Sequence, residues 1–193
     1  MKNVVLAVFG VLALAAQANA QGKWYTNRAD WLLLVTNVRT AEYTSSKNSP
    51  LPIEENGVTA TKTGSSNLVA NGGFLTASGN DIPITFTFSG NAFFGEFNTR
   101  IANGSIVFSI DGSLTNIYTL TNLTGSSTKF LGYISNSGSD ISVKLTPNSD
   151  NRVRVQSFSA GQSVAPEPGT LALALTGGCA LVGMYIRRRR MSN

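Results

Sequence analysis

The sequence contains no histidine and a single cysteine, and only 13% of its residues are charged. Without histidine, the chain cannot form a Ser-His-Asp triad, a Cys-His nucleophile or a histidine-ligated metal centre. The one cysteine, Cys179, lies in an apolar run near the C-terminus, so the rest of the chain has no disulfide. We expect no cofactor and no metal site.

Carboxylates are the remaining route to catalysis, because a glycosidase requires only two of them. Most of the acidic residues stand beside Gly, Asn or Ser at predicted turns, where aspartate is expected for backbone reasons alone. Glu96 lies among three phenylalanines, although a solvated strand face explains it as well. We predict that the protein is not an enzyme, with a carboxylate-dependent glycan hydrolase as the less favoured alternative. The candidate carboxylates are Glu54, Glu55, Asp81, Glu96, Asp111, Asp140 and Asp150.

The positive charge is concentrated at the two ends of the chain. The formal net charge is +5 and the isoelectric point is near 9.6. Lys2 and the four arginines 187–190 account for five positive charges, and between residues 21 and 165 ten Lys/Arg face nine Asp/Glu. This middle part has no basic stripe that would contact phosphates, so we expect no nucleic-acid partner.

The N-terminus has the pattern of a secretory signal peptide. Lys2 precedes a short apolar run from Val4 to Ala16, and Ala18-Asn19-Ala20 forms a small-x-small cleavage site before Gln21. The apolar run is too short for a permanent membrane span. We predict that residues 1–20 are a signal peptide that is translocated by the Sec translocon. Signal peptidase would recognise Ala18 and Ala20 and cleave before Gln21.

The C-terminus has three parts in a fixed order. Pro166-Glu167-Pro168 comes first, an uncharged apolar run reaches Ile186, and Arg187, Arg188, Arg189 and Arg190 follow. The prolines stop any helix from continuing through them. A transmembrane helix over residues 170–186 would span roughly 25 Å, and arginines can snorkel across the rest of a core of about 30 Å. The arginines are a stop-transfer tail that stays cytoplasmic.

This order at the extreme C-terminus resembles the PEP-CTERM sorting signal of Gram-negative bacteria. The resemblance covers residues 164–193 and implies recognition by exosortase, a membrane-embedded enzyme, at Pro166, Glu167 and Pro168. It implies a transient anchor in the inner membrane, followed by the cell surface or extracellular matrix. Gly169 departs from the family, in which many members have serine. A plain membrane anchor is the alternative.

Residues 21–163 remain as one exported domain. Asn27 is an N-cap residue type and Asp30 lies in the first turn, so we predict a short helix from about Arg28 to Val35. Residues 36–67 are broken by prolines and by Asn56-Gly57, and one strand is predicted over 58–62.

From residue 67 onward the pattern is β. Apolar residues alternate with polar ones from Ile82 to Phe88, and Pro83 places that end at an edge or at the start of a strand. Asp111-Gly112 predicts a hairpin before a strand over 113–121. Further strands are predicted around residues 106–110, 129–135, 141–145 and 153–158. Strands at this spacing predict an antiparallel β-sandwich or jelly-roll ectodomain.

Several stretches also resemble the ectodomains of PEP-CTERM proteins, which are similar to lectin-like or carbohydrate-binding sandwiches. They are the opening helix at residues 27–32 and the segments 93–97, 104–112 and 129–135. Many members carry an Asp-Asn pair near the last strand. We compared residues 152–158 with that stretch, and they lack the pair.

The ligand is the least determined feature of the sequence. Oxygen-rich loops at 137–140 and 148–151 are compatible with calcium, although turn chemistry explains them equally. Trp24 and Tyr25 are the candidates for stacking on a sugar, whereas Trp31 is expected to pack in the core. We predict a structural or adhesive role associated with exopolysaccharide or biofilm, with a carbohydrate-binding module as the alternative.

Overall fold

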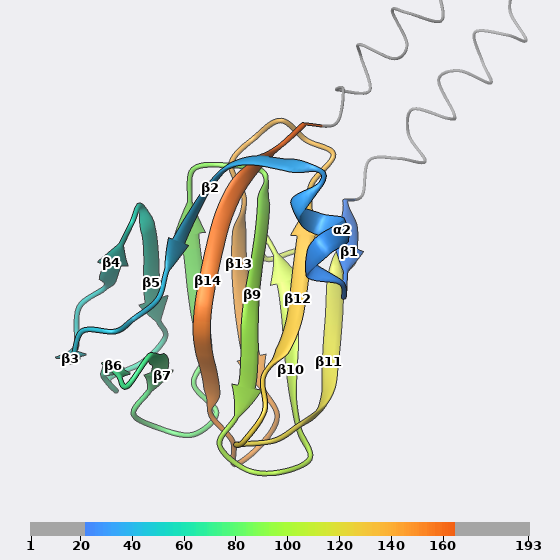
Figure 1. The fold of residues 1–193 in the computed structure, drawn as a ribbon. Coiled ribbons are helices and arrows are strands. Elements are labelled where there is room, and N and C mark those ends of the chain that lie inside the picture. Colours follow the sequence, from blue (N-terminus) through green and yellow to red (C-terminus); the bar gives the residue numbers. More distant parts are fainter. Residues whose placement is uncertain (1–21, 165–193) are drawn as a thin grey trace, which may run out of the picture. The chain divides into compact units, whose positions relative to one another are not determined.

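Strands dominate residues 22–164, the part of the chain that the computed structural model describes (Figure 1). The one helix in this part is short, and the strands are joined by turns. In chain order the elements are β1 (Lys23–Tyr25), α2 (Arg28–Leu32), β2 (Val35–Ala41), β3 (Lys47–Ser49), β4 (Ile53–Glu55), β5 (Val58–Lys62), β6 (Leu68–Asn71), β7 (Phe74–Ala77), β8 (Ile84–Phe88), β9 (Ala92–Thr99), β10 (Gly104–Ile110), β11 (Ile117–Leu123), β12 (Lys129–Ile134), β13 (Ser142–Pro147) and β14 (Val153–Ser163).

The strands form two sheets, which we call sheet A and sheet B. Sheet A has eight strands in the order β1-β12-β9-β14-β7-β6-β3, with β2 paired to β14 beside this path. Sheet B has six strands in the order β11-β10-β13-β8-β5-β4. Neighbouring strands pair antiparallel in both sheets, for example β9 with β14 and β10 with β13. The prediction of a mainly β, antiparallel fold is therefore confirmed.

The main hydrophobic core lies between the two sheets. Ile84, Phe86 and Phe88 alternate with threonines along β8 and are buried, as the sequence predicted. Phe86 of sheet B stacks on Phe158 of sheet A, and both belong to one continuous cluster of buried residues. Because each sheet contributes the inward half of its side chains, the two sheets form a sandwich.

A second, smaller core covers the outer face of sheet A. Trp31 of α2 is fully buried there against Phe94 of β9 and Ile134 of β12. Its indole Nε1 donates a hydrogen bond to the Tyr133 carbonyl, and Gly132 leaves the space for the ring, since a Cβ there would lie 2.6 Å from Trp31 Cδ1. The packing role predicted for Trp31 is confirmed, although it packs outside sheet A and not between the sheets.

The helix is shorter than predicted. Asn27 is its N-cap, with its side chain accepting a hydrogen bond from the Ala29 amide, but the helix ends at Leu32. Val35 already pairs with Ser163 at the start of β2. The apolar residues after Trp31 have the composition of a helix, and pairing with the last strand overrides that local preference.

The turn of the predicted hairpin is also longer than expected. Asp111 and Gly112 both have the positive φ that a tight turn requires, and the Ser113 amide donates to the Ile110 carbonyl. The next strand nevertheless begins at Ile117, not Ser113, because Ser113 Oγ accepts hydrogen bonds from the amides of Thr115 and Asn116. Pro83 lies directly before β8, an inner strand of sheet B, so it marks the start of a strand and not an edge.

Three predictions fall outside the described residues: the signal peptide at 1–20, the Pro-Glu-Pro motif at 166–168, and the transmembrane helix at 170–186 with its arginines. Among residues 22–164, no helix has the length and apolar character needed to cross a membrane.

Candidate functional site

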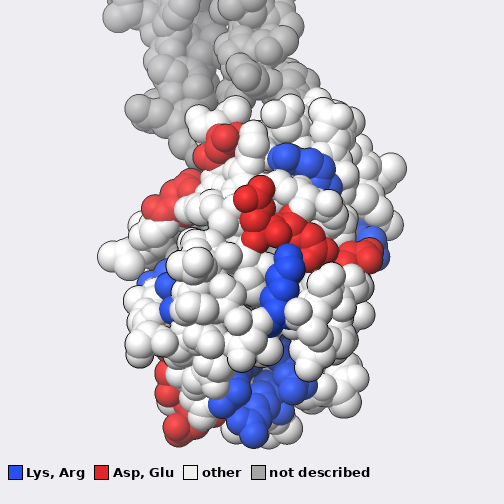
Figure 2. All heavy atoms as spheres, turned by 90° about the vertical axis from the view of Figure 1, so that its left-hand side faces the viewer, with Lys and Arg blue, Asp and Glu red and all other residues white. Residues whose placement is uncertain are grey.

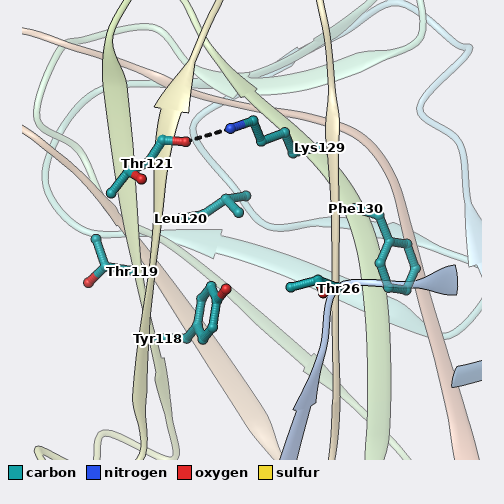
Figure 3. Close-up of a pocket in the computed structure, with 7 residues that line it drawn as sticks. All are labelled: Thr26, Tyr118, Thr119, Leu120, Thr121, Lys129 and Phe130. Atoms are coloured by element: carbon teal, nitrogen blue, oxygen red, sulfur yellow. Dashed lines mark hydrogen bonds between the residues drawn. The ribbon is translucent and has the colours of Figure 1, made fainter. Parts of the chain in front are cut away.

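A groove lies between the edge strand β11 of sheet B and the strand β12 of sheet A (Figure 3). Its volume is about 380 Å³. β11 supplies four of the lining residues, β12 supplies two, and one follows β1. The lining residues are Thr26, Tyr118, Thr119, Leu120, Thr121, Lys129 and Phe130.

The side chains of β11 divide between the core and the solvent. Leu120 is buried and Tyr118 packs against the main core, with its ring 5.4 Å from that of Trp24. Thr119 and Thr121 are exposed and point to the other face of the strand (Figure 3). This alternation is the ordinary period of a strand. It places the Tyr118 ring and the hydroxyls of Thr119 and Thr121 on opposite faces of β11.

The backbone edge of β11 is also available to a ligand. The Asn116 carbonyl accepts from Ile110 N, and Tyr118 is the register partner of Phe108. Alternate residues of an antiparallel strand bond to the same neighbour, so the N–H and C=O of Thr119 point away from β10. Lys129 Nζ donates to the Thr121 carbonyl at 2.9 Å and occupies one acceptor of this edge (Figure 3).

The lining combines hydrogen-bonding groups with apolar surface. It contains three threonines, one tyrosine, one leucine, one phenylalanine and one ammonium group. It contains no carboxylate, so these residues offer no acid–base pair for hydrolysis. They provide hydrogen-bond donors and acceptors beside apolar surface, which suits a neutral or weakly acidic ligand that carries many hydroxyls.

A second hollow, of about 470 Å³, lies beside the register shift between β14 and β2. Arg39 is its one charged residue, and its Nη2 donates to the Ser89 carbonyl at 2.6 Å. The remaining groups are two amides, a hydroxyl, the apolar side chain of Val38 and backbone. The lining residues are Asn37, Val38, Arg39, Ser89, Gly161 and Gln162.

Trp24, a candidate for stacking on a sugar, packs partly against the core. Its ring lies 4.7 Å from that of Tyr133 and 6.1 Å from that of Phe93, at the margin of the main core. Trp24 is half-buried, as Tyr118 is, so part of its ring contacts the core. Tyr25 packs against the outer core, and partial burial, with a smaller contribution from Asp30, raises the pKa of its phenol. The three-residue strand β1, which turns Trp24 inward, gave no sequence signal.

The described carboxylates mostly support turns. Asp111 Oδ1 accepts from the backbone N–H and hydroxyl of Ser142, and Asp140 Oδ1 accepts from the Gly90 amide. Glu96 forms an ion pair with Arg28 at 3.7 Å on the outer face of sheet A. The remaining candidates are Glu54 and Glu55 of β4, and Asp81 and Asp150, which adopt positive φ in turns. None of these residues lines the two hollows described above.

The oxygen-rich loops use their side chains to hold the backbone. Asn148 Oδ1 accepts from the Ser105 amide, and Ser135 Oγ accepts from the Ser137 amide. Across residues 22–164 there is no group of three His, Cys, Asp or Glu side chains with the geometry of a metal site.

Asn151 is an organising residue that the sequence interpretation missed. It is buried, its Oδ1 accepts from the amides of Ile101 and Arg152, and its carbonyl accepts from the Asp81 amide. It therefore connects three loops at one end of the sandwich. The signal was present in the sequence, because an Asp-Asn pair, Asp150-Asn151, stands directly before the stretch 152–158.

Comparisons with known proteins add the following. No protein-family model matches the chain, and no curated protein sequence matches it. Among solved structures, a family two carbohydrate esterase from Cellvibrio japonicus is similar at a TM-score of 0.43 and 14% identity, covering 64% of this chain and 36% of the esterase. CBM29_1, a family 29 carbohydrate-binding module from Piromyces equi, is similar at 0.39 and 8% identity, covering 66% of this chain and 93% of that module. Similarities at this level are not an argument for a ligand or an activity.

Proposed function

We propose that this protein is exported and that its β-sandwich binds polysaccharide, without cleaving it, in the groove between β11 and β12. The observation that carries the proposal is the lining of that groove, which combines the half-buried Tyr118 with threonines, the open backbone edge of β11 and the ammonium group of Lys129. Export rests on the predicted signal peptide and on the resemblance of residues 164–193 to a sorting signal.

A sugar presents apolar C–H faces and a rim of hydroxyls. The ring of Tyr118 offers an apolar surface to the first, and threonines and the free backbone of Thr119 offer hydrogen bonds to the second. The volume is near the lower end of the roughly 300–1,000 Å³ that ligand sites occupy. A short segment of a glycan chain fits this size, and the position beside a strand edge lets the rest of the chain continue into solvent.

Binding is tested with the domain of residues 22–164. This domain is expected to fold alone, because both hydrophobic clusters are built from residues within it. A glycan array identifies the sugar, and electrophoresis through gels containing that polysaccharide measures affinity. Tyr118→Leu with Lys129→Ala should weaken binding about ten-fold or more, since a ring face and a charged donor are removed together.

The matched control changes the same residue types elsewhere: Tyr25→Leu with Lys144→Ala. This control should bind like the wild type. Equal loss in both double variants would refute the groove as the site. No binding to any glycan by a folded domain would leave a purely structural role at the surface as the conclusion.

Sorting is tested separately in an exosortase-bearing host by intact mass and cell fractionation, beside Glu167→Ala. A mature chain that begins at Gln21 and ends near Pro166–Thr170, and that is lost in the variant, is the expected result. A full-length C-terminus in the membrane in both strains would indicate a plain anchor.

A further inference from the structure

Three arginines occupy adjoining positions where β9 and β14 meet at the end of the sandwich that holds Asn151. Arg154 is the register partner of Asn98. The Arg100 amide donates to the Arg152 carbonyl, which continues the ladder two residues further and places Arg100 opposite Arg152. Side chains two residues apart in a strand project to the same side.

The side chains of the three arginines and of Asn98 lie on the outer face of sheet A. The residues that alternate with them, Phe97 and Thr99 on β9 and Val153 and Val155 on β14, are buried, and three of these belong to the main core. The outward positions therefore form a small lattice of three arginines and one asparagine. Partners are about 5 Å apart across the strands, and successive outward positions are about 7 Å apart along each strand.

This arrangement is unfavourable for folding. Like charges directly opposite each other destabilise a sheet, and Arg100 and Arg152 are such a pair. No carboxylate forms an ion pair with them, because the one ion pair among residues 22–164 joins Arg28 to Glu96. Asp81 and Asp150 lie in neighbouring turns but form no ion pair with the cluster.

Local contacts hold two of the guanidinium groups in place. Arg152 Nε donates to Asn80 Oδ1 at 2.9 Å, and Arg154 Cζ lies 5.9 Å from the centroid of the Phe74 ring. The fourth position carries a second unfavourable feature, since Asn98 is 1% exposed and its Oδ1 has no hydrogen-bond partner. Local conflicts of this kind are expected where a surface is selected for binding and not for stability.

Basic side chains gather locally on one side of the domain. Figure 2 shows them at the lower end of this side of the molecule, with some acidic side chains beside them and others across its middle. The domain as a whole is almost neutral, with ten basic and nine acidic residues between 21 and 165. A local cation cluster on a neutral domain favours a ligand with localised negative charges.

We propose that Arg100, Arg152 and Arg154 bind an anionic polysaccharide through its carboxylate or sulfate groups. The planar guanidinium fork matches such groups in a bidentate manner, and an acidic glycan repeats its charge along the chain. The cluster shares no residue with the groove between β11 and β12. A negative result at one site therefore does not count against the other.

The test compares the mobility of the domain of residues 22–164 in gels containing polygalacturonate with its mobility in gels containing neutral dextran. Retardation by polygalacturonate alone is expected, and it should fall as salt is raised. The triple variant Arg100→Gln, Arg152→Gln, Arg154→Gln should lose affinity about ten-fold or more. Its matched control, Lys23→Gln, Lys62→Gln, Lys144→Gln, removes the same charge elsewhere and should keep the affinity.

Each outcome is decisive. Equal loss in both triple variants means that only net charge matters and overturns the site, as does retention in the arginine variant. Competition by a short single-stranded DNA as effective as that by polygalacturonate indicates a general polyanion site and overturns the polysaccharide assignment. Thermal unfolding separates these outcomes from misfolding, since removing the Arg100–Arg152 repulsion should not lower the melting temperature. Tyr118→Leu with Lys129→Ala should leave polygalacturonate binding unchanged even if the groove binds another glycan.

Discussion

The rings of Phe86 and Phe158 stack across the sandwich with their centroids 4.1 Å apart and their planes 6° apart. Phe86 belongs to β8 of sheet B and Phe158 to β14 of sheet A. Phe158 also stacks on Phe93 at 5.3 Å within sheet A. One side chain thus connects the long central strand of one sheet to an inner strand of the other.

Phe158→Ala should lower the free energy of unfolding by about 3–5 kcal/mol, because the lost ring leaves a cavity between both sheets. Urea unfolding of the domain of residues 22–164, followed by tryptophan fluorescence, measures the change. Phe74→Ala, at a half-buried position on the outer face of sheet A, is the control and should cost less. A similar loss at both positions would contradict the central role of Phe158.

Glu55 should stabilise the fold while its neighbour Glu54 does not. Glu55 Oε1 accepts hydrogen bonds from the amides of Glu42 at 3.0 Å and Tyr43 at 3.2 Å. Glu55→Ala leaves two amides without this partner and should cost about 1–3 kcal/mol. Glu54 is exposed, so Glu54→Ala should change stability by less than about 0.5 kcal/mol. Thermal unfolding of both variants side by side gives the comparison, and equal effects would refute the assignment.

The sequence predicted strands where burial alternates along one strand. The strand over 58–62 was found as β5, and the alternation up to Phe88 was found in β8. Prediction from the sequence failed where pairing with a distant strand decides the structure. β2 follows an apolar run that favours a helix, and it is extended because it pairs with β14, more than a hundred residues later.

The groove could not be predicted for the same reason. Thr26 and Lys129 are distant in the sequence, and neither threonine nor lysine at such spacing indicates a site. The arginine cluster was hidden because Arg100 and Arg152 become neighbours only through the register of β9 and β14. Turn and cap chemistry was easier to predict, because Asp111 and Asn27 act on backbone groups through their own short side chains.

Asn151 should hold together one end of the sandwich. Asn151→Ala removes the acceptor of the Ile101 and Arg152 amides and should cost about 1–3 kcal/mol of unfolding free energy. Asn151→Asp keeps an acceptor oxygen and should cost less. Ser149→Ala, in the same turn but exposed, is the control. Hydrogen exchange should show faster exchange of the Ile101 amide in Asn151→Ala alone, and unchanged exchange there would contradict the role.

Tyr43 should limit stability at high pH. Its side chain is fully buried and its hydroxyl has no hydrogen-bond partner, so Tyr43→Phe removes an unsatisfied polar group and should raise the free energy of unfolding by about 1 kcal/mol near pH 7. Burial, with a smaller contribution from Glu55, raises the pKa of the phenol far above its ordinary value of 10.0. The unfolded chain therefore releases the Tyr43 proton above about pH 10 while the folded chain keeps it, so stability is lost as pH rises past that point.

The difference in the free energy of unfolding between wild type and Tyr43→Phe, measured by urea unfolding, should widen from pH 9 to pH 11, because this loss is absent in the variant. Tyr118→Phe removes a hydroxyl from a half-buried ring and serves as the control at pH 7, where it should not raise stability. A constant difference across the pH range would show that Tyr43 ionises equally in both states and would refute its burial as the cause.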